Sequence, residues 1–496
     1  MPVSQRGGPS SLGSPAVTGH NVRLRHSNHV TSMHIGIDFG TSYSAAAAII
    51  NGQLTLVRFG ESEQFRTAVF FPELVPDPSD FELTPDLEAQ LEAQLRLTRT
   101  QHRQAAAAAA ARGQAPVSRS EEALRQEALR VVRRQWMEDQ TREATASVAS
   151  FQHALFGEEA VEGYLDSGGG NLIESPKSMF GYRLDPQVRK VIVHIATHIL
   201  EHIRLTASRQ FGVPVRGAVI GRPVEFRSSM GAAGSEQAIE ILREAAAVAG
   251  FDEVRFLEEP AAAAMHYHKS LDARQHALIV DIGGGTTDVT HAELGGELAP
   301  LIARNWGLPK GGTDLDVSVS LHSFMPLLGK DIVRVPQHQF VEAASVHNLP
   351  KQREFRKQNY RLVAAPYGPR LRALQELGAT TRLNQVAERT KITLSGTANY
   401  RAELDFIEPG LAAETSSDDF DAAIETFLVQ LERTLTTVRT DLTALPASVF
   451  LTGGTSRSPH IKARVQACFP EIPLVLGDPS LGVVSGLAVA ASETAA

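Results

Sequence analysis

The first predicted strands begin at Met33, where apolar and polar residues start to alternate along the chain. Residues 34–50 alternate and then become apolar around a glycine-containing turn, a pattern typical of a strand, a tight turn and a second strand. An Asn-Gly pair follows at 51–52, which is a strong short-range signal for a hairpin. The folded part is therefore predicted to open with short strands joined by tight turns.

Strand-like and helical segments alternate through the rest of the chain. Apolar residues recur at helical spacing over 191–211, and Gly212 follows as a helix stop. The segment 276–282 is apolar almost throughout, as expected of a strand covered on both faces of a sheet. This alternation predicts an α/β fold. The other predicted strands are 216–223, 254–260 and 448–454, and the other predicted helices are about 234–249, 420–441 and 458–469.

Two helix-rich segments look like insertions on this fold. Residues 82–150 are rich in Ala, Glu, Gln and Arg and contain seven consecutive alanines from Ala105, a composition that favours helix. The alanine run is equally compatible with a flexible connector between two helices, because alanine offers nothing that packs on a partner with specificity. A second polar, helix-rich segment covers about 320–380.

The feature that decides the fold class is a pair of matching turns. One strand ends in GIDFGTS at 36–42, and another ends in VDIGGGTTD at 280–288. Each turn places an aspartate at the end of a strand, followed by glycine and then by hydroxyl side chains. Two copies of one arrangement, about half the chain apart, predict two similar lobes that close on one ligand.

The composition of these turns indicates a ligand that carries phosphate. Without a Cβ, glycine lets backbone N–H groups approach anionic oxygens closely. The aspartates would repel phosphate directly, but they suit a hydrated Mg²⁺ that bridges to phosphate oxygens. Neither a GxxxxGK[ST] loop nor a GxGxxG turn that opens a helix occurs, so the paired hairpins indicate the actin-like class. The hydroxyl donors would be Thr41, Ser42, Thr286 and Thr287, and the aspartates are Asp38, Asp281 and Asp288.

Composition excludes several other classes of protein. A formal net charge of -8 argues against a general nucleic-acid binder, whose affinity rests on cationic contacts with phosphates. The single cysteine, Cys468, excludes an internal disulfide and fits a reducing compartment. The first 32 residues are rich in Ser, Gly and Pro and lack the apolar run of a signal peptide, so they are predicted to be a disordered tail. No apolar run approaches the roughly 20 residues of a membrane span, and we expect a cytoplasmic protein.

Six segments then follow one another in a fixed order: GIDFGTSYSAAAA, FLEEPAAAAMHY, ALIVDIGGGTTDVT, KGGTDLD, AERTKITLS and VFLTGGTSRSPHIKARV. In this order they resemble the motifs of the DnaK-type heat shock protein 70 chaperone family, over about residues 33–490. The third segment is very close to the second phosphate loop of that family. The resemblance implies an actin-like ATPase fold, in which two ribonuclease H-like lobes surround a nucleotide cleft and carry helical insertions.

The resemblance implies roles for the residues around the phosphate turns. Lys177, in ESPKSMFG, matches a lysine that reaches the γ-phosphate, where its charge would stabilise the transition state of phosphoryl transfer. Glu259 and Asp288 match an acidic pair that positions metal-bound waters or the attacking water. Asp38 and Asp281 are expected to organise Mg²⁺ and its waters. Phosphate contacts are expected from Gly40, Thr41, Ser42, Gly283, Gly284, Gly285 and Thr286, the last also counted as catalytic.

The later motifs imply the adenosine end of the site. One departure is Ile392, which stands where the family has an arginine that stacks on adenine. Isoleucine offers apolar contact without cation–π stacking, so ATP affinity is expected to be lower by roughly 1–2 kcal/mol. The closing motif is also altered, to DPSLGVVSG, which puts a role for Ser480 in doubt. Adenosine contacts are expected from Glu388, Lys391, Ser395, Gly453, Gly454 and Arg457, and further nucleotide contacts from Gly311 and Gly312.

The same resemblance predicts how the chain is divided. The first ATPase lobe is expected to comprise 33–271 together with 478–496, and the second 272–477. The chain ends soon after the last expected ATPase helix, so the expectation is a nucleotide-binding domain alone. In this layout, without the peptide-binding domain of typical members, the sequence is similar to the short YegD-like branch of the family.

The expected function is that of a chaperone or chaperone-like switch that binds ATP and ADP with Mg²⁺ and hydrolyses ATP slowly. A protein client or co-chaperone would contact the insertions, with no nucleic acid or membrane partner. Two alternatives remain open, an ATP sensor with little hydrolysis and an actin-like structural ATPase. A small-molecule kinase would need a catalytic base beside a sugar pocket, and no such pattern is found.

Overall fold

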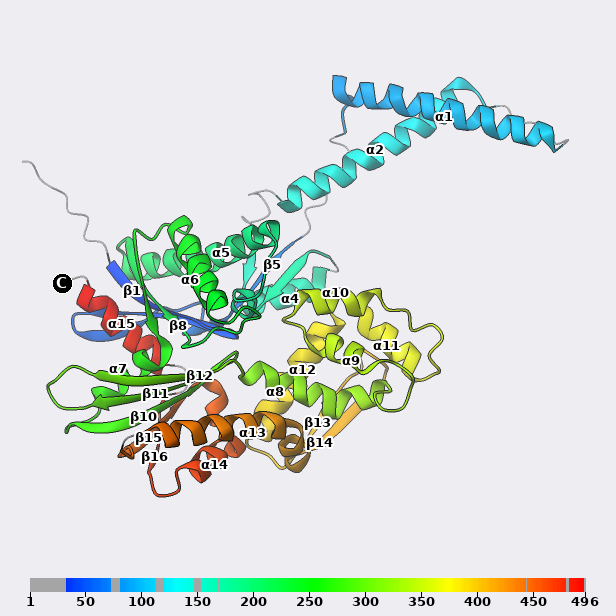
Figure 1. Ribbon diagram of the computed structural model, residues 1–496. Coiled ribbons are helices and arrows are strands. Elements are labelled where there is room, and N and C mark those ends of the chain that lie inside the picture. The colour runs from blue at the N-terminus through cyan, green and yellow to red at the C-terminus, as the bar shows by residue number, and fades with distance from the viewer. Residues whose placement is uncertain are drawn as a thin grey trace, which may run out of the picture. The chain divides into compact units, whose positions relative to one another are not determined.

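The computed structural model of the chain describes residues 33–72, 81–112, 119–146, 153–167, 169–442, 444–478 and 481–494 (Figure 1). The predicted tail, residues 1–32, and Ser480 lie outside the described residues. Two β-sheets with flanking helices form the framework, and each sheet is the centre of one lobe. We call these halves the first and the second lobe.

The first sheet has the strand order β3-β2-β1-β8-β9, and β4 pairs with β2. Strand β1 is antiparallel to β2 and parallel to β8. Asn51 and Gly52 connect β2 to β3 with φ angles of 51° and 77°, which agrees with the predicted hairpin turn. The strands are β1 (Met33–Phe39), β2 (Tyr43–Ile50), β3 (Gln53–Leu56), β4 (Gln64–Arg66), β8 (Val215–Arg222) and β9 (Glu253–Glu258).

The second sheet repeats this arrangement with the order β12-β11-β10-β15-β16. Its first strand, β10, is antiparallel to β11 and parallel to β15, so order and direction match those of the first sheet. The prediction of a duplicated, actin-like α/β fold is therefore confirmed. The strands are β10 (Gln275–Ile282), β11 (Thr287–Leu294), β12 (Leu301–Leu308), β15 (Ser448–Thr452) and β16 (Leu474–Leu476).

Helices cover both faces of each sheet. Helices α5 and α6 pack in one apolar cluster with Ile35 and Ile37 of β1, and α15 covers the other face through Val484 and Ala488. Helix α7 packs on α15, and their cluster contains residues of both sheets, so it joins the lobes. These helices are α5 (Pro186–Phe211), α6 (Ala232–Val248), α7 (Glu259–His268) and α15 (Gly482–Thr494), and the second sheet is covered by α8 (Gly312–Val319), α13 (Ser417–Asp441) and α14 (Pro459–Cys468).

The ends of the long helices follow local capping chemistry. Helix α5 begins at Pro186, five residues before the predicted start at 191, because Asp185 caps it by accepting the N–H of Gln187. It ends as predicted at Gly212, whose φ of 70° is the left-handed conformation that glycine adopts readily. Helix α13 begins three residues before the predicted 420 because Ser416 and Asp419 form a capping box.

The first insertion contains two long helices, α1 (Pro85–Ala111) and α2 (Glu121–Ala146). They pack on each other through a small apolar cluster of their own, which includes Leu91, Leu95 and Val132. The alanine run from Ala105 belongs to α1. Of the two alternatives for this run, a helix or a flexible connector, the structure shows a helix. Alanine has the highest intrinsic helix propensity, which suffices without a packing partner.

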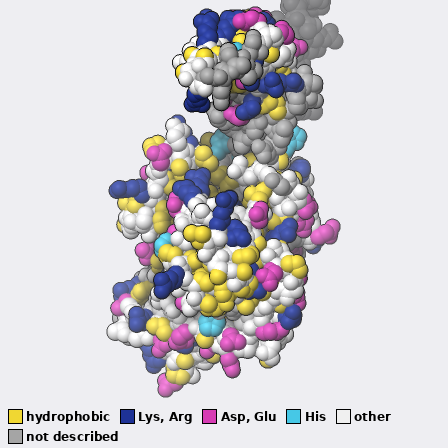
Figure 2. Space-filling view, turned by 90° about the vertical axis from the view of Figure 1, so that its right-hand side faces the viewer, with side chains coloured by type: hydrophobic (Ala, Val, Ile, Leu, Met, Phe, Trp, Pro, Cys, Tyr) yellow, Lys and Arg dark blue, Asp and Glu magenta, His cyan; other side chains and the backbone are white. Residues whose placement is uncertain are grey.

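The second insertion extends the core of the second lobe. The side chains of Phe340, Phe355 and Leu374 join the same buried cluster as Leu278 of β10. Figure 2, which faces the side of the molecule where α9–α11 lie in Figure 1, shows an apolar area bordered by Lys and Arg side chains. The elements of this insertion are η3 (Ser320–Phe324), η4 (Met325–Leu328), α9 (Gln337–Ala344), α10 (Leu349–Lys357) and α11 (Tyr367–Gln375). The chain then continues into α12 (Ala379–Leu394), β13 (Asn399–Glu403) and β14 (Ala412–Ser416).

A third, three-stranded sheet has the order β6-β5-β7. It presents η2, which carries Lys177. Within the described part of the chain, no helix is both long enough and apolar enough to cross a membrane. The remaining elements are β5 (Ala68–Phe71), β6 (Leu155–Phe156), β7 (Asn171–Glu174), α4 (Glu158–Ser167), η2 (Pro176–Met179) and η5 (Gly454–Arg457).

One partly buried histidine, His202, contributes to the pH dependence of the first lobe's stability. His202 stacks on Phe156 with a centroid distance of 4.4 Å and also contacts Phe59 and Phe65. Burial among these rings, with a smaller effect of Arg209, lowers the pKa of His202 to about 4. The unfolded chain, with an ordinary histidine pKa of about 6.5, binds this proton first. The stabilisation is therefore complete above pH 6.5 and is lost as the pH falls toward 4.

We predict that His202→Phe makes the free energy of unfolding less dependent on pH between 4 and 6.5. Wild type should lose on the order of 2 kcal/mol more than the variant over this range. Urea denaturation at a series of pH values measures the difference. His338→Gln, at an exposed histidine, should keep the wild-type slope. Parallel pH profiles for wild type and His202→Phe would contradict the prediction.

Candidate functional site

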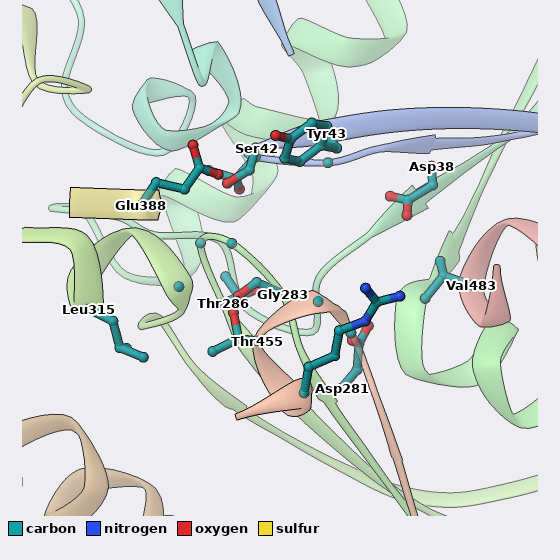
Figure 3. A pocket seen from close by; sticks show the side chains of 18 of the residues that line it. Asp38, Ser42, Tyr43, Asp281, Gly283, Thr286, Leu315, Glu388, Thr455 and Val483 are labelled. Carbon is teal, nitrogen blue, oxygen red and sulfur yellow. Dashed lines mark hydrogen bonds between the residues drawn. The ribbon is translucent and has the colours of Figure 1, made fainter. Parts of the chain in front are cut away.

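A cavity of about 430 Å³ lies where the two lobes meet. It is lined by the β1–β2 and β10–β11 turns, by Lys177 on η2, and by the starts of α7 and α8. The far end is lined by α12 and η5. Figure 3 shows Asp38, Ser42 and Tyr43 of the first lobe and Asp281 and Thr286 of the second around one common space. The strand ends of both sheets therefore meet at one site.

The structure gathers the sequence-predicted residues in this cavity, with three exceptions. Thr287 is fully buried outside the lining, and its hydroxyl donates to the carbonyl of Lys310 at 2.9 Å. Asp288 is 1% exposed and lies behind the lining, where its carboxylate accepts the N–H of Val224 at 2.7 Å. Gly311 is also outside the lining, and its N–H donates to Asp314 at 3.0 Å. The lining includes Asp38, Gly40, Thr41, Ser42, Lys177, Glu259, Asp281, Gly283, Gly284, Gly285, Thr286, Gly312, Glu388, Lys391, Ser395, Gly453, Gly454 and Arg457.

The two glycine-containing turns face each other directly. A Cβ on Gly284 would lie 2.3 Å from Oγ of Ser42, and a Cβ on Gly285 would lie 2.4 Å from Oγ1 of Thr41. Only glycine permits this approach, because real Cβ atoms do not come so close to another atom. The backbone of one turn and the hydroxyl groups of the other therefore share one small volume, which suits a group with several anionic oxygens.

Lys177 supplies a buried positive charge to this volume. Its Nζ lies 2.6 Å from Oε1 of Glu259, and the side chain is 6% exposed. Burial alone would lower the pKa of Lys177, but the charge of Glu259, followed by that of Asp38, outweighs burial and raises the pKa. Lys177 is therefore an ammonium ion at neutral pH.

The backbone before Lys177 is held in an unusual conformation. Ser175 has φ 52° and ψ 49°, the left-handed region, although it is not glycine and precedes Pro176. Its N–H donates to the carbonyl of Thr67 at 2.9 Å, and its own carbonyl accepts the hydroxyl of Ser178 at 2.7 Å. Such conformations persist only where the surroundings fix them, and they cluster at functional sites. Here the turn aims Lys177 into the cavity.

Carboxylates are concentrated around this lysine. Burial, followed by the charge of Glu259, raises the pKa values of Asp38 and Asp288 to about 7. The same two causes raise the pKa of Asp281, to which Asp288 and Asp38 also contribute. One ammonium group cannot balance four carboxylates, so the site favours an additional cation.

This donor set fits a hydrated Mg²⁺. Among the described residues, no three Asp, Glu, His or Cys side chains converge closely enough to chelate a bare ion. Mg²⁺ often keeps several waters and uses only one or two carboxylates, with phosphate oxygens as further ligands. Asp38 and Asp281, at the ends of equivalent strands, could hold such an ion through its waters.

The far end of the cavity combines polar side chains with one exposed isoleucine. Lys391 is held by Asp316 at 2.7 Å and by the carbonyl of Gly312 at 3.3 Å, and Ser395 donates to the carbonyl of Lys391 at 3.0 Å. Ile392 lines the cavity and is 62% exposed. Across from it, Gly453, Gly454 and Arg457 belong to the segment that follows β15.

Sequence reasoning missed several residues of the cavity. Tyr43 directly follows the first phosphate turn, and Thr455 and Ser458 lie inside a quoted motif. The sequence could therefore have identified all three as residues of the cavity. Leu315 and Val483 also lie inside quoted motifs, and Gln64 carries no signal of this kind. The residues concerned are Tyr43, Gln64, Leu315, Thr455, Ser458 and Val483.

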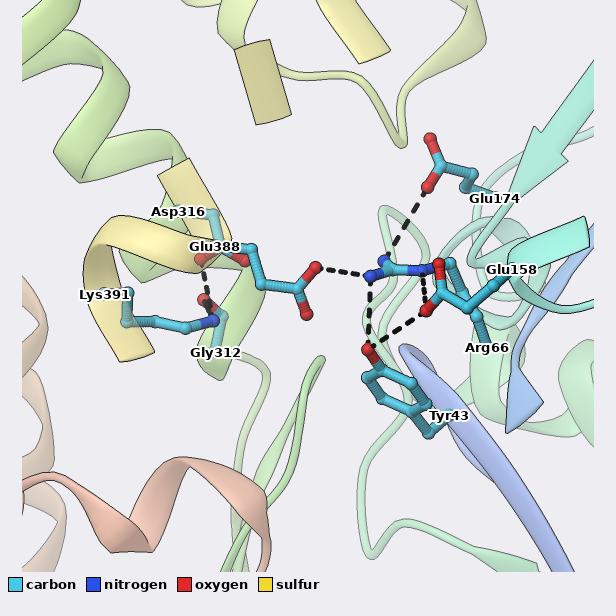
Figure 4. Close-up of polar contacts among 8 residues, drawn as sticks. All are labelled: Tyr43, Arg66, Glu158, Glu174, Gly312, Asp316, Glu388 and Lys391. Atoms are coloured by element: carbon cyan, nitrogen blue, oxygen red, sulfur yellow. Dashed lines mark hydrogen bonds and ion pairs between the residues drawn. The ribbon is translucent and has the colours of Figure 1, made fainter. Parts of the chain in front are cut away.

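Sequence reasoning also missed a network centred on Arg66, which bridges the lobes beside the cavity (Figure 4). Arg66, on β4 of the first lobe, donates from Nη2 to Glu388 on α12 of the second lobe at 2.7 Å. Glu158 lies at 3.0 Å and Glu174 at 3.9 Å, and Tyr43 accepts a hydrogen bond at 3.1 Å. Burial raises the pKa of Glu174 to about 7 despite the opposing charge of Arg66.

Comparisons with known proteins agree with this geometry. Residues 187–331 match the family model described as Hsp70 protein. Chaperone protein DnaK 1 of Synechococcus sp. is 29% identical over 338 residues, which cover 64% of this chain and 39% of that protein. The chain therefore resembles proteins of the Hsp70 family over this region. Human heat shock 70 kDa protein 13 is 27% identical over 314 residues, 60% of this chain and 64% of that protein. DnaK of Thermus thermophilus is 26% identical over 308 residues, 60% of this chain and 43% of that protein.

The matches to Hsp70 proteins thus cover less than two thirds of each of these relatives. The family model spans α5, the first lobe's α6 and α7, and the second phosphate turn. The duplicated α/β sheets of this chain are consistent with the actin-like ATPase fold of the Hsp70 family.

We predict that Arg66→Ala lowers the free energy of unfolding by about 3 kcal/mol, because it leaves Glu174 and Glu388 buried without their cation. Urea denaturation at pH 7.5 measures the change. Arg464→Ala is the matched control, since its partners Glu425 and Glu432 are half exposed and such pairs contribute less than about 1 kcal/mol. Equal losses of unfolding free energy in the two variants would show that the Arg66 network stabilises the protein no more than an exposed ion pair does.

Proposed function

We propose that this chain binds ATP with Mg²⁺ in the cavity between the lobes and hydrolyses it slowly, as the nucleotide switch of an Hsp70-like chaperone. The observation that carries the proposal is the facing pair of phosphate turns around a buried lysine and an excess of carboxylates. Hsp70-family proteins bind ATP with Mg²⁺ and are ATPases, which supports the same reading.

Each group then has a defined task. Asp38 and Asp281 would hold the waters of Mg²⁺, which would neutralise charge on the phosphate oxygens. Thr41, Ser42 and Thr286, with the N–H groups of Gly283, Gly284 and Gly285, would donate to the β- and γ-phosphates. The adenosine would lie toward α12 and η5, between Ile392 and Arg457. These assignments use the positions of the side chains around the cavity.

Hydrolysis requires a water molecule to attack the γ-phosphorus as the bond to the β–γ bridging oxygen breaks. Lys177 would exchange its contact with Glu259 for an equatorial phosphate oxygen and so stabilise the charge that the transition state carries. Glu259, released from Lys177, would accept a hydrogen bond from the attacking water. Asp288 would act from behind the lining, through its contacts with Thr286 and Val224.

The lobe boundaries belong to this proposal. We assign 33–271 with 478–496 to the first lobe and 272–477 to the second, so that ATP would contact both. A client or co-chaperone would bind through the helical insertions, whose accessibility would change with lobe closure. The chaperone activity of the whole protein is part of the same proposal, because the chain spans only part of the relatives it matches.

A second candidate, an ATP sensor with little hydrolysis, is favoured by one observation. Ile392 lies at the adenosine end of the cavity, and isoleucine cannot provide the cation–π contact of an arginine. Weaker binding of the base leaves less binding free energy to position the phosphates for reaction. The sensor and the ATPase differ in the hydrolysis step alone.

We predict that Lys177→Ala lowers the single-turnover rate of ATP hydrolysis by about 100-fold or more, because it removes a preorganised charge from the transition state. Rapid mixing of excess protein with labelled ATP and Mg²⁺ measures the rate. Lys190→Ala, at an exposed lysine on α5, should hydrolyse like wild type. ATP binding without hydrolysis in wild type would select the sensor, and failure to bind ATP in calorimetry would refute both candidates.

We predict that Ile392→Arg increases ATP affinity by about 5- to 30-fold, which corresponds to the roughly 1–2 kcal/mol of a cation–π contact with the base. Isothermal titration calorimetry compares the two dissociation constants. Ile332→Arg places the same charge on an isoleucine that is 61% exposed in the second insertion and should leave the affinity unchanged. A gain common to both variants would indicate a general charge effect, and no gain at Ile392 would place the base elsewhere.

A further inference from the structure

Arg227 connects the first lobe to the second phosphate turn. It lies on the segment between β8 and α6, and its Nη2 donates to the carbonyl of Gly285 at 3.1 Å. The same nitrogen forms an ion pair with Asp314 in the first turn of α8. Gly285 and Asp314 both belong to the second lobe, so one guanidinium contacts two of its elements.

Asp314 is itself firmly held. Its carboxylate accepts Nζ of Lys310 at 2.9 Å and the N–H of Gly311 at 3.0 Å, and the latter caps α8. The first turn of α8 is also bonded to the phosphate turn, because Gly312 donates to the carbonyl of Gly283 at 2.9 Å. The phosphate turn and the start of α8 therefore behave as one hydrogen-bonded unit, and Arg227 holds this unit from the opposite lobe.

The position of Arg227 separates it from direct contact with the nucleotide. It is absent from the lining of the main cavity but borders a neighbouring one of about 10 Å³, which has room for about one water molecule. That small cavity is also lined by Lys177, Thr41 and Thr286. The Nε of Arg227 is buried there and has no hydrogen-bond partner among the described residues. Arg227 thus lies directly behind the side chains that we propose bind phosphate.

We propose that Arg227 is a positioning residue that couples the closure of the lobes to the geometry of the second phosphate turn, a role that rests on the proposed ATPase function. Its bonds to Gly285 and Asp314 keep the turn against Thr41, where Gly285 has no space for a Cβ. Donors that are held in place before the reaction stabilise a transition state without having to reorganise. Loss of Arg227 should therefore slow the chemical step more than it weakens ATP binding.

The test compares Arg227→Gln with wild type in single-turnover hydrolysis and in ATP calorimetry. We expect the rate to fall about 10- to 100-fold while the dissociation constant changes less than about threefold, because only the reacting geometry is disturbed. Arg227→Lys, which keeps the charge opposite Asp314, should recover part of the rate. Arg370→Gln is the control, since its pair with Glu408 at 2.8 Å lies within the second lobe.

A double-mutant cycle identifies the partner. Asp314→Asn keeps an oxygen for the N–H of Gly311 but loses the ion pair with Arg227. The double variant should be no slower than the slower single variant, because residues in one network are not additive. Additive losses, a wild-type rate in Arg227→Gln, or a loss of affinity equal to the loss of rate would each overturn the proposed role.

A second measurement does not depend on activity. In hydrogen exchange without nucleotide, Arg227→Gln should speed the exchange of amides at 283–288 and 310–316, and Arg370→Gln should not. Faster exchange combined with no hydrolysis in wild type would refute the proposed ATPase function but retain the contact of Arg227 with the turn. Unchanged exchange would refute the role of Arg227 even in an active ATPase.

Discussion

The architecture depends on the burial of four carboxylates beside one ammonium group. Asp38, Asp281 and Asp288 lie at the ends of strands or directly after them, and Glu259 opens α7 where it meets Lys177. Burial and mutual repulsion raise the pKa values of the three aspartates, so this arrangement opposes folding unless further positive charge enters. The packed, apolar sheets behind the site stabilise the fold against this cost, and under the proposed function a ligand that brings a cation would balance the charge.

The lobes meet at this charged centre, and two arginines tie them together beside it. Arg66 of the first lobe reaches Glu388, and Arg227 of the same lobe reaches Asp314. Both arginines belong to the first lobe and both acceptors to the second. Separation of the lobes would therefore leave partly desolvated carboxylates without their positively charged partners. These pairs therefore favour closure of the lobes, and under the proposed function a nucleotide would shift the same equilibrium further toward closure.

Much of the fold and the centre of the site could be predicted from the sequence, because they rest on local patterns. The turns at 36–42 and 280–288 carry their own chemistry, and a repeated pattern implies a repeated structure. The ion pairs could not be predicted in this way. Arg66 and Glu388 are 322 residues apart, and nothing in the spacing or composition around either residue indicates the other. Arg227 lies in a loop with an unremarkable sequence, and its role depends on where the second lobe places Gly285.

The same distinction explains which local predictions were inaccurate. Apolar spacing predicts too late a start for α5, because it does not register the first turn, where Asp185 and Pro186 set the boundary by capping.

Lobe closure also affects the end of the cavity proposed to bind adenosine. Under the proposed function Ile392 would not provide a cation–π contact with the base, and part of the free energy that such a contact would supply for closure would come instead from Arg66 and Arg227. When ion pairs within the protein already hold the lobes together, weaker binding of the base is sufficient. The ligand then needs to supply only the rest of the free-energy difference between the open and closed states.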